Sequence, residues 1–199
     1  MKAKIGIAPI AWSNDDLPEL GGETSLETCL SEAKMAGFIG VETGGKFPKT
    51  SKELKPILDY YKISLCGGWY SGTLLDNDLE DEKLKVRSQM DLFKDLGAPC
   101  LVYGETSGTI QNIRNAPLNS RRILSEEQFK IYGEKVTNFF EWCEVEGISL
   151  SFHHHMGTAV ETEKDLDYLM YYTSETVGLL FDPGHMAFAG GNIQDIIKK

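Results

Sequence analysis

Short apolar or β-branched runs alternate with longer amphipathic segments along the whole sequence. The short runs predict strands at residues 4–10, 39–43, 63–66, 100–103, 148–153 and 178–181. The longer segments predict helices at residues 25–36, 51–61, 79–96, 125–146, 163–172 and 192–199. Such strict alternation predicts an α/β fold with a parallel sheet and helical crossovers, either a doubly wound sheet or a barrel.

Two absences favour the barrel. No GxGxxG pattern follows the first predicted strand and no P-loop motif occurs, so the nucleotide-binding form of the doubly wound sheet loses support. A complete TIM barrel, (β/α)8, usually needs about 250 residues. The chain has 199 residues and six predicted βα units, with no composition break. We therefore expect a single TIM-barrel domain over residues 1–199, truncated to about six βα units, with strands seven and eight missing.

Charge and hydropathy exclude several classes of partner. The formal net charge of −10 opposes nucleic-acid binding, because phosphate contacts need clustered Lys and Arg. No apolar run approaches the roughly 20 residues that span a bilayer. The N-terminus has no signal-peptide pattern, so we expect a cytoplasmic protein without a membrane partner. The four cysteines form no CxxC pair and are expected to be reduced thiols.

Residue types that carry chemistry gather at the ends of the predicted strands. In a barrel these ends converge on one face, where active sites lie. In chain order the candidates are Trp12, Asn14, Asp15, Glu42, Lys46, Trp69, Tyr70, Glu105, His153, His155, Asp182 and His185.

The histidines are the most informative of these residues. Side chains alternate between the two faces of a strand, so His153 and His155 share a face and His154 opposes them. Together with Asp182 from the next strand, His153 and His155 predict a set of ligands for a divalent transition metal. The alternative, a surface tag or a solvated loop, does not fit three histidines directly after the apolar strand in SLSFHHHMGT.

The other candidates have structural alternatives that remain open. Trp12 and Trp69 could be core or rim aromatics instead of walls of a substrate site. Glu42 and Asp15 could cap a turn or a helix. Lys46 could be a solvated loop lysine or an electrostatic clamp on a developing enolate.

Six segments resemble those of bacterial inosose dehydratases, in the xylose isomerase-like superfamily. They are GIAPIAWSNDDLPELGG, VETGGKFP, GGWYSG, YGETSGTIQ, FHHHMGT and FDPGHMAFAGG. FDPGH alone is a superfamily-wide pattern, whereas WSNDD, GGWYSG and HHHMGT in this order are far more specific. The similarity covers nearly the whole chain.

This resemblance implies a hydro-lyase that uses a divalent metal, Mn²⁺ or Co²⁺, to dehydrate 2-keto-myo-inositol to a trihydroxycyclohexane-dione in inositol catabolism. His153 takes the fifth-strand ligand position, where relatives often have Glu, and Asp182 takes the sixth. His185 matches a histidine that meets substrate hydroxyls or a second metal. Ligands that the superfamily supplies from strands seven and eight have no counterpart in this chain.

The roles expected of the remaining residues follow the chemistry of the dehydration. His155, His185, Lys46 and Glu105 are the candidates for proton transfer and catalysis. Substrate binding is expected from Trp12, Asn14, Asp15, Glu42, Trp69 and Tyr70, with a small cyclic polyol ketone as the partner. A homo-oligomer is compatible with the sequence. The alternatives are a sugar-ketone isomerase or epimerase of the same superfamily, and an inactive fragment of the dehydratase.

Overall fold

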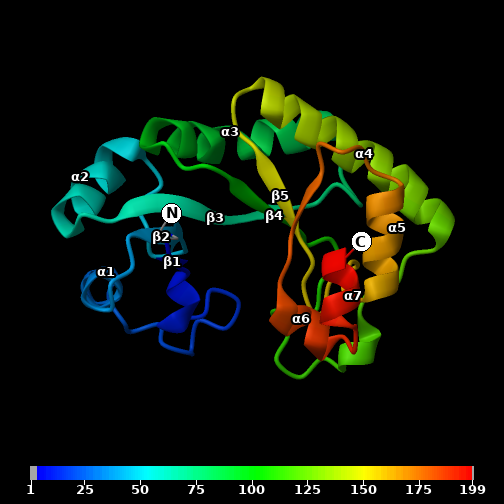
Figure 1. Ribbon diagram of the computed structural model, residues 1–199, viewed down its shortest axis with the longest axis horizontal. Coiled ribbons are helices and arrows are strands. Elements are labelled where there is room, and N and C mark those ends of the chain that lie inside the picture. Colours follow the sequence, from blue (N-terminus) through cyan, green and yellow to red (C-terminus); the bar gives the residue numbers. More distant parts are fainter. Residues whose placement is uncertain (1–3, 199) are drawn as a thin grey trace. The chain divides into compact units, whose positions relative to one another are not determined.

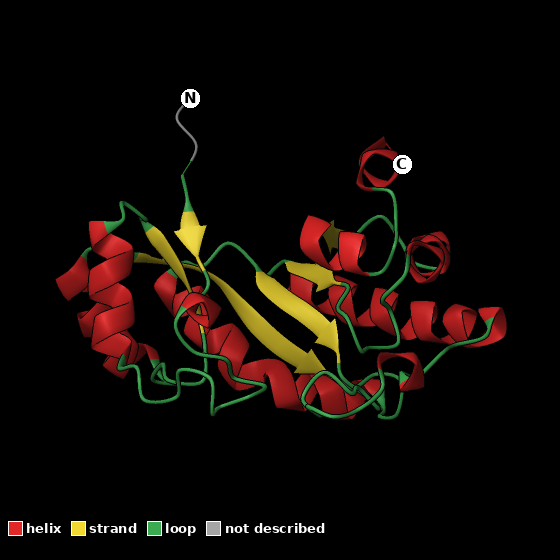
Figure 2. Cartoon of the chain, turned by 90° about the horizontal axis from the view of Figure 1, so that it is seen from below, coloured by secondary structure: helices red, strands yellow, loops and turns green. Residues whose placement is uncertain are grey.

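The computed structural model describes residues 4–198, in which strands and helices alternate (Figures 1 and 2). The strands are β1 (Gly6–Ile7), β2 (Gly40–Thr43), β3 (Ser64–Gly72), β4 (Leu101–Glu105), β5 (Leu150–His153) and β6 (Gly178–Leu180). The helices are α1 (Leu26–Met35), α2 (Ser51–Tyr61), α3 (Leu79–Leu96), α4 (Glu126–Val145), α5 (Glu163–Tyr171), α6 (Pro183–Phe188) and α7 (Ile193–Lys198). Two short 3₁₀ helices, Pro9–Ala11 and Leu118–Ser120, lie in loops. The six predicted βα units are confirmed.

The order of the strands identifies the type of sheet. Hydrogen bonds join the strands in the order β1-β2-β3-β4-β5-β6. Pairs β1–β2, β2–β3 and β5–β6 are parallel, with Gly6 opposite Gly40 and His153 opposite Leu180. A doubly wound sheet reverses its strand order at a switch point, whereas a barrel runs sequentially. The observed order is that of a TIM barrel, of which the described residues form six units.

Strand β3 is longer than the sequence predicted. The pattern GGWYSG, expected to follow the strand, lies inside it, because β3 continues to Gly72. Its glycines serve packing: a Cβ on Gly72 would overlap the ring of Tyr103, and one on Gly68 would overlap Thr43. Strand β4 likewise continues through Glu105. Strand β1 is shorter than predicted because Pro9 begins a 3₁₀ helix.

The predicted helix ends agree closely with the structure. Ser125 forms a capping box with Gln128 at the start of α4. Gly37, Gly97 and Gly147, which follow helices, have φ angles of 91°, 67° and 89°, a conformation that favours glycine. The last predicted helix, residues 192–199, is present as α7, and Lys199 lies outside the described residues.

The chain forms two compact units, each described by itself below. The first contains residues 1–69 and 86–101, and the second contains residues 70–85 and 102–199. In the first unit α1 and α2 lie beside β1 and β2 (Figure 1), and Leu30, Leu54 and Phe93 are fully buried. In the second unit α4 lies along α5. The prediction of a single domain stays a prediction.

The aromatic core of the second unit centres on Tyr103 of β4. The ring centroids of Phe139, Phe140 and Phe152 lie 5.8, 5.6 and 5.5 Å from the Tyr103 centroid. Rings at such separations attract each other through their edges and faces as well as through buried area. This core fixes α4 and β5 and so the strand that ends at His153.

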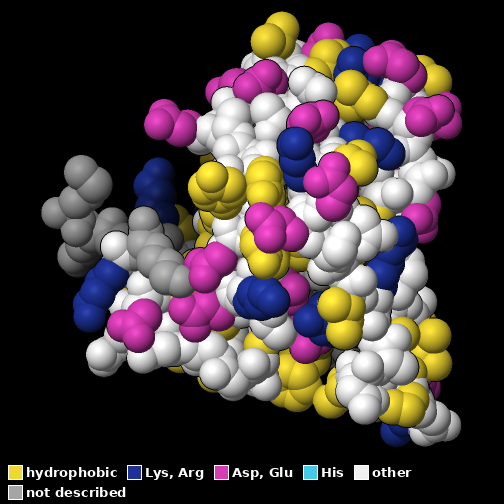
Figure 3. Space-filling view, turned by 90° about the vertical axis from the view of Figure 1, so that its right-hand side faces the viewer, with side chains coloured by type: hydrophobic (Ala, Val, Ile, Leu, Met, Phe, Trp, Pro, Cys, Tyr) yellow, Lys and Arg dark blue, Asp and Glu magenta, His cyan; other side chains and the backbone are white. Residues whose placement is uncertain are grey.

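Surface features complete the description. On the face seen in Figure 3, acidic and basic side chains are interspersed, without a continuous stripe of one charge. Among residues 4–198 no helix is long and apolar enough to cross a membrane. The four cysteines are free thiols, as predicted: Cys29 and Cys143 are buried, and Cys66 and Cys100 are half-buried.

Candidate functional site

Three histidines of the second unit converge at the ends of β5 and β6. Nitrogen atoms of His153, His155 and His185 all lie within 4.8 Å of one another. The ring centroids of His155 and His185 are 4.2 Å apart, and those of His153 and His185 are 5.0 Å apart. The predicted pairing of His153 and His155 on one face therefore agrees with the structure, and α6 adds His185 to the group.

Backbone carbonyls orient two of these rings. Nδ1 of His155 lies 2.8 Å from the carbonyl oxygen of Met156, and Nδ1 of His185 lies 3.1 Å from that of His154. A carbonyl oxygen can only accept, so Nδ1 carries the proton of each neutral ring and Nε2 is the nitrogen able to bind a metal. Such a bond through the second ring nitrogen is the usual support of a metal-binding histidine.

Burial disfavours the charged form of two histidines at the end of β5, His153 and His154. Burial, together with the neighbouring His185 and His155, lowers the pKa of His153 to about 3. Burial also lowers the pKa of His154. An imidazole must be neutral to bind a metal, so these electrostatics suit a ligand better than a cation.

Asp182 supports the cluster from the start of α6. It is the N-cap residue, and its Oδ1 accepts a hydrogen bond of 2.9 Å from the backbone N of His185. Burial opposes ionisation, but this bond and the electrostatic interaction with the neighbouring His185 outweigh it and lower the pKa of Asp182. Its Oδ2 lies 3.9 Å from Nδ1 of His185. Of the two predicted metal ligands, His153 belongs to the group of three histidines. Asp182 caps the helix that carries His185, and its predicted role as a ligand stays a prediction.

The middle histidine, His154, has a structural role that was not predicted from the sequence. Its side chain is fully buried. Its Nε2 accepts a hydrogen bond of 3.4 Å from the backbone N of Asp182, and its carbonyl oxygen binds His185. His154 therefore joins the end of β5 to the start of α6. Strand alternation predicted that His154 lies on the face opposite His153 and His155, but it did not predict a hydrogen-bonding partner for His154.

Glu105 of β4 lies in a closed environment in the second unit. It is 1% exposed. Its carboxylate accepts hydrogen bonds from the Tyr103 hydroxyl (2.9 Å), from Ser107 N (2.9 Å) and from Leu75 N (3.3 Å). Burial nevertheless raises the pKa of this carboxyl. These contacts tie the loops after β3 and β4 together, and the predicted role in proton transfer stays a prediction.

Tyr70 is also enclosed within the second unit. It is 5% exposed, its hydroxyl donates to the fully buried Glu82, and its ring stacks on Phe139 at a centroid distance of 6.3 Å. Glu82 also accepts a 2.8 Å bond from Thr73. Tyr70 thus contacts Glu82 of α3, Phe139 of α4 and Tyr103 of β4, and its predicted contact with substrate stays a prediction.

In the first unit the predicted residues bind neighbouring loops and helix α1. Trp12 donates to Glu32 through its indole nitrogen (2.5 Å). Asn14 Oδ1 accepts from the backbone N of residues 16 and 17, at 2.9 and 3.0 Å. Asp15 Oδ2 accepts from Gly45 N (2.7 Å), and Lys46 Nζ donates to Gly22 O (2.5 Å). These bonds hold the loop after β1 against the loop after β2.

The last two candidates, Trp69 and Glu42, lie in the first unit, Trp69 in a groove and Glu42 at a half-buried position of β2. The groove has a volume of about 340 Å³ and is lined by Asp15, Thr43, Gly44, Gly45, Pro48, Lys49, Trp69, Ser88, Gln89 and Leu92. Burial raises the pKa of Glu42 on β2. Burial, followed by the charge of Glu42, raises the pKa of Cys66 on β3 to about 11. Trp69 and Asp15 thus share a groove, and Glu42 lies beside Cys66.

Sequential βα units with a histidine cluster after the fifth and sixth strands define a TIM-barrel-type protein with a potential metal site. A family model described as "Xylose isomerase-like TIM barrel" matches residues 30–199, so the chain belongs to this family.

Individual relatives refine this assignment. The rhizopine catabolism protein MocC of Rhizobium meliloti is 48% identical over 96% of this chain and 59% of its own length. The inosose dehydratase of Geobacillus thermodenitrificans is 35% identical over 100% of this chain and 67% of its own. A sugar phosphate isomerase/epimerase structure from Parabacteroides distasonis shares the fold, with a TM-score of 0.71, 15% identity and coverage of 99% and 72%. The chain thus spans about three fifths to two thirds of these two sequence relatives.

Proposed function

We propose that this chain binds a divalent metal through His153, His155 and His185. We propose further that it acts as a hydro-lyase, which dehydrates 2-keto-myo-inositol to a trihydroxycyclohexane-dione in inositol catabolism. The observation that carries the proposal is the group of three imidazoles whose nitrogens lie within 4.8 Å. Relatives named inosose dehydratase, at 35% and 37% identity, support the choice of reaction. The partner would be a small cyclic polyol ketone, and a cytoplasmic location stays a prediction.

The donor set favours one of the two predicted metals. Imidazole nitrogen binds the later transition metals well, whereas Mn²⁺ prefers carboxylate and water oxygens. Three histidines therefore favour Co²⁺ over Mn²⁺. When bound, such a metal acts as a Lewis acid that polarises the ketone oxygen.

Hydrogen bonding supports the roles that we propose for two of the histidines. The elimination removes a proton from the carbon next to the ketone and releases the hydroxyl of the following carbon as water. His155 and His185 hold Nδ1 on a carbonyl, so only Nε2 can bind a metal or take a proton. One nitrogen cannot do both at once, so we assign both residues to metal binding. Lys46 and Glu105 remain the predicted groups for proton transfer.

A second candidate comes from the relative with 48% identity. Its name places that protein in rhizopine catabolism, which favours a reaction on a compound of that pathway.

An isomerase or epimerase would use the same metal and enolate but would return the proton to the ring without loss of water.

A product assay on the purified chain tests these proposals. The chain is stripped of metal, reloaded with Co²⁺ and mixed with 2-keto-myo-inositol, and the products are separated by mass. Loss of one water supports the dehydratase, and an isomer of unchanged mass supports the isomerase. His185→Ala should lose Co²⁺ binding, whereas Gln194→Ala, an exposed residue of the neighbouring α7, should keep it. Binding without turnover would support the inactive fragment, and failure of the wild type to bind Co²⁺ would reject the metal site.

A further inference from the structure

Arg121 is a buried cation that the proposed function does not use. It lies in the long loop between β4 and α4, and its side chain is 10% exposed. Its Nη2 lies 2.9 Å from Oδ2 of Asp165, and its Nε lies 3.4 Å from Oε1 of Glu161. These two carboxylate side chains are 8% and 12% exposed. Charges removed from water in this way need close partners, and the planar guanidinium can bind several at fixed angles.

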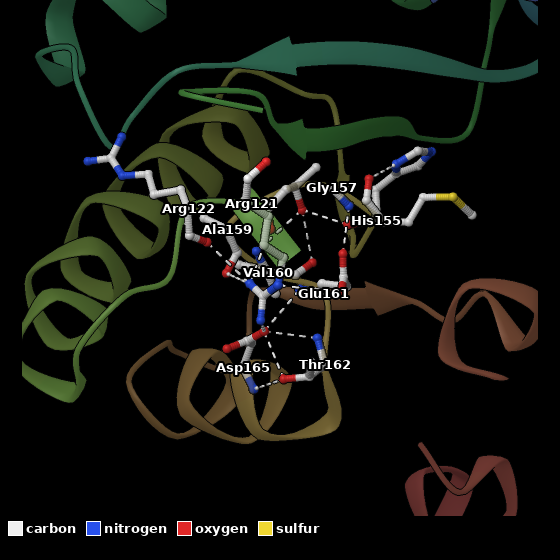
Figure 4. Close-up of polar contacts among 12 residues, drawn as sticks. Arg121, Arg122, His155, Gly157, Ala159, Val160, Glu161, Thr162 and Asp165 are labelled. Carbon is white, nitrogen blue, oxygen red and sulfur yellow. Dashed lines mark hydrogen bonds and ion pairs between the residues drawn. The ribbon is translucent and has the colours of Figure 1, made fainter. Parts of the chain in front are cut away.

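The same guanidinium also binds the main chain of the loop after β5 (Figure 4). Its Nη1 donates to the carbonyl oxygens of Thr158 and Ala159, at 3.3 and 3.4 Å. Oε2 of Glu161 accepts a bond of 2.6 Å from the backbone N of Gly157. Arg121 therefore holds this loop both directly and through Glu161.

The loop held by Arg121 also fixes His155. The backbone N of His155 donates to Val160 O (3.1 Å), and its carbonyl oxygen accepts from the Thr158 hydroxyl (2.8 Å). The ring is fixed through Nδ1 on Met156 O. Each of these partners lies between Gly157 and Glu161 or directly beside them, in the segment that the guanidinium binds. A change in the path of this segment would therefore rotate or shift the imidazole.

We propose that Arg121 is a positioning residue for the histidine site: by clamping the loop of residues 156–161, it sets the position and angle at which His155 presents Nε2. The inference rests on the proposed metal-binding role of His153, His155 and His185. Groups that orient a metal ligand typically change metal affinity by roughly 10–100-fold when they are replaced. Glu161 acts with Arg121 in this clamp.

Arg121→Lys is the variant that tests the clamp. Lysine keeps the positive charge but cannot bind two carboxylates and two carbonyls in one plane. The matched control is Arg122→Lys in the same loop, because Arg122 pairs with the exposed Asp76 (2.7 Å). Each purified chain is titrated with Co²⁺ alone, and its visible absorption spectrum and its metal-free melting temperature are recorded. We expect Arg121→Lys to weaken Co²⁺ binding roughly 10–100-fold and to alter the spectrum, and Arg122→Lys to match the wild type.

A second variant separates positioning from folding. Arg121→Met combined with Glu161→Gln and Asp165→Asn removes the buried charges together, so no carboxylate is left unpaired. It should also bind Co²⁺ more weakly than the wild type. If Arg121→Lys or the triple variant melts at a lower temperature but keeps wild-type Co²⁺ affinity and spectrum, Arg121 only stabilises the fold and the inference is wrong. Failure of the wild type to bind Co²⁺ would instead reject the metal site itself, and the inference with it.

Discussion

The strand ends of the two units use their polar side chains in different ways. In the first unit Asp15 and Lys46 bind backbone groups of facing loops, at 2.7 and 2.5 Å, and Asn14 binds its own turn. In the second unit His155 and His185 lie with Nδ1 against backbone carbonyls, and their rings lie close together, with centroids 4.2 Å apart. Polar side chains at strand ends can thus hold loops together or gather into a cluster of potential metal-binding groups. A polar residue at a strand end is therefore a weak indication of function until its bonds are known.

Removal of a cluster histidine should give the largest effect. His153→Ala deletes one of three nitrogen donors. Replacing a group that only orients a ligand costs up to roughly 100-fold in metal affinity, so the loss of a donor should lower Co²⁺ affinity by more than that. Asp15→Ala serves as the matched variant from the first unit and should leave Co²⁺ affinity unchanged. Isothermal titration of both chains measures the contrast. Equal losses in the two variants would show that the two regions do not differ as described.

Glu105 offers a pH-dependent test of a buried acid in the second unit. Because burial raises its pKa in the folded state, the folded chain binds this proton more tightly than the unfolded chain does. The free energy of unfolding should therefore fall as pH rises from the ordinary Glu value through the raised value. Glu105→Gln should flatten this fall in urea unfolding at several pH values. Glu134→Gln, at an exposed position of α4, should leave the wild-type slope. An unchanged slope in Glu105→Gln would contradict the prediction.

The smallest effect is expected in the first unit. Asp15→Ala removes the acceptor for Gly45 N, but Asp15 is exposed and water can replace it. The loss in the free energy of unfolding should be about 1 kcal/mol. Urea unfolding measures it, with the exposed Asp59→Ala on α2 as the control that should change less, since its partner Lys55 is also exposed. A loss several times larger would mean that Asp15 does more than hold the loop.

Much of the fold follows from the sequence, for reasons visible in single elements. Ser125 with Gln128, and the glycines after α1, α3 and α4, mark helix ends through local chemistry that needs no tertiary information. The length of β3 could not be predicted in this way. Glycine and serine in GGWYSG suggest a turn, yet Gly72 is needed because the Tyr103 ring occupies the space of a side chain. That requirement comes from a neighbouring strand.

The site was predictable to a similar degree. Strand alternation brings His153 and His155 together, and the spacing in DPGH brings Asp182 to the backbone of His185. The six-residue helix α6 was missed because it is too short for a helical period and begins with Pro and Gly. Arg121 could not be linked to the site from the sequence, since its partners lie about 40 residues away along the chain.

The carbonyl anchors of His155 and His185 have a consequence for redesign. Every residue type contributes the same carbonyl oxygen, so the side chains at Met156 and His154 do not supply the atoms that orient these rings. The orientation of both imidazole rings therefore depends on the path of the main chain. A protein engineer could thus vary the side chain of Met156 freely for size or polarity while leaving the direction of the ligand untouched, provided that the path of the loop is kept.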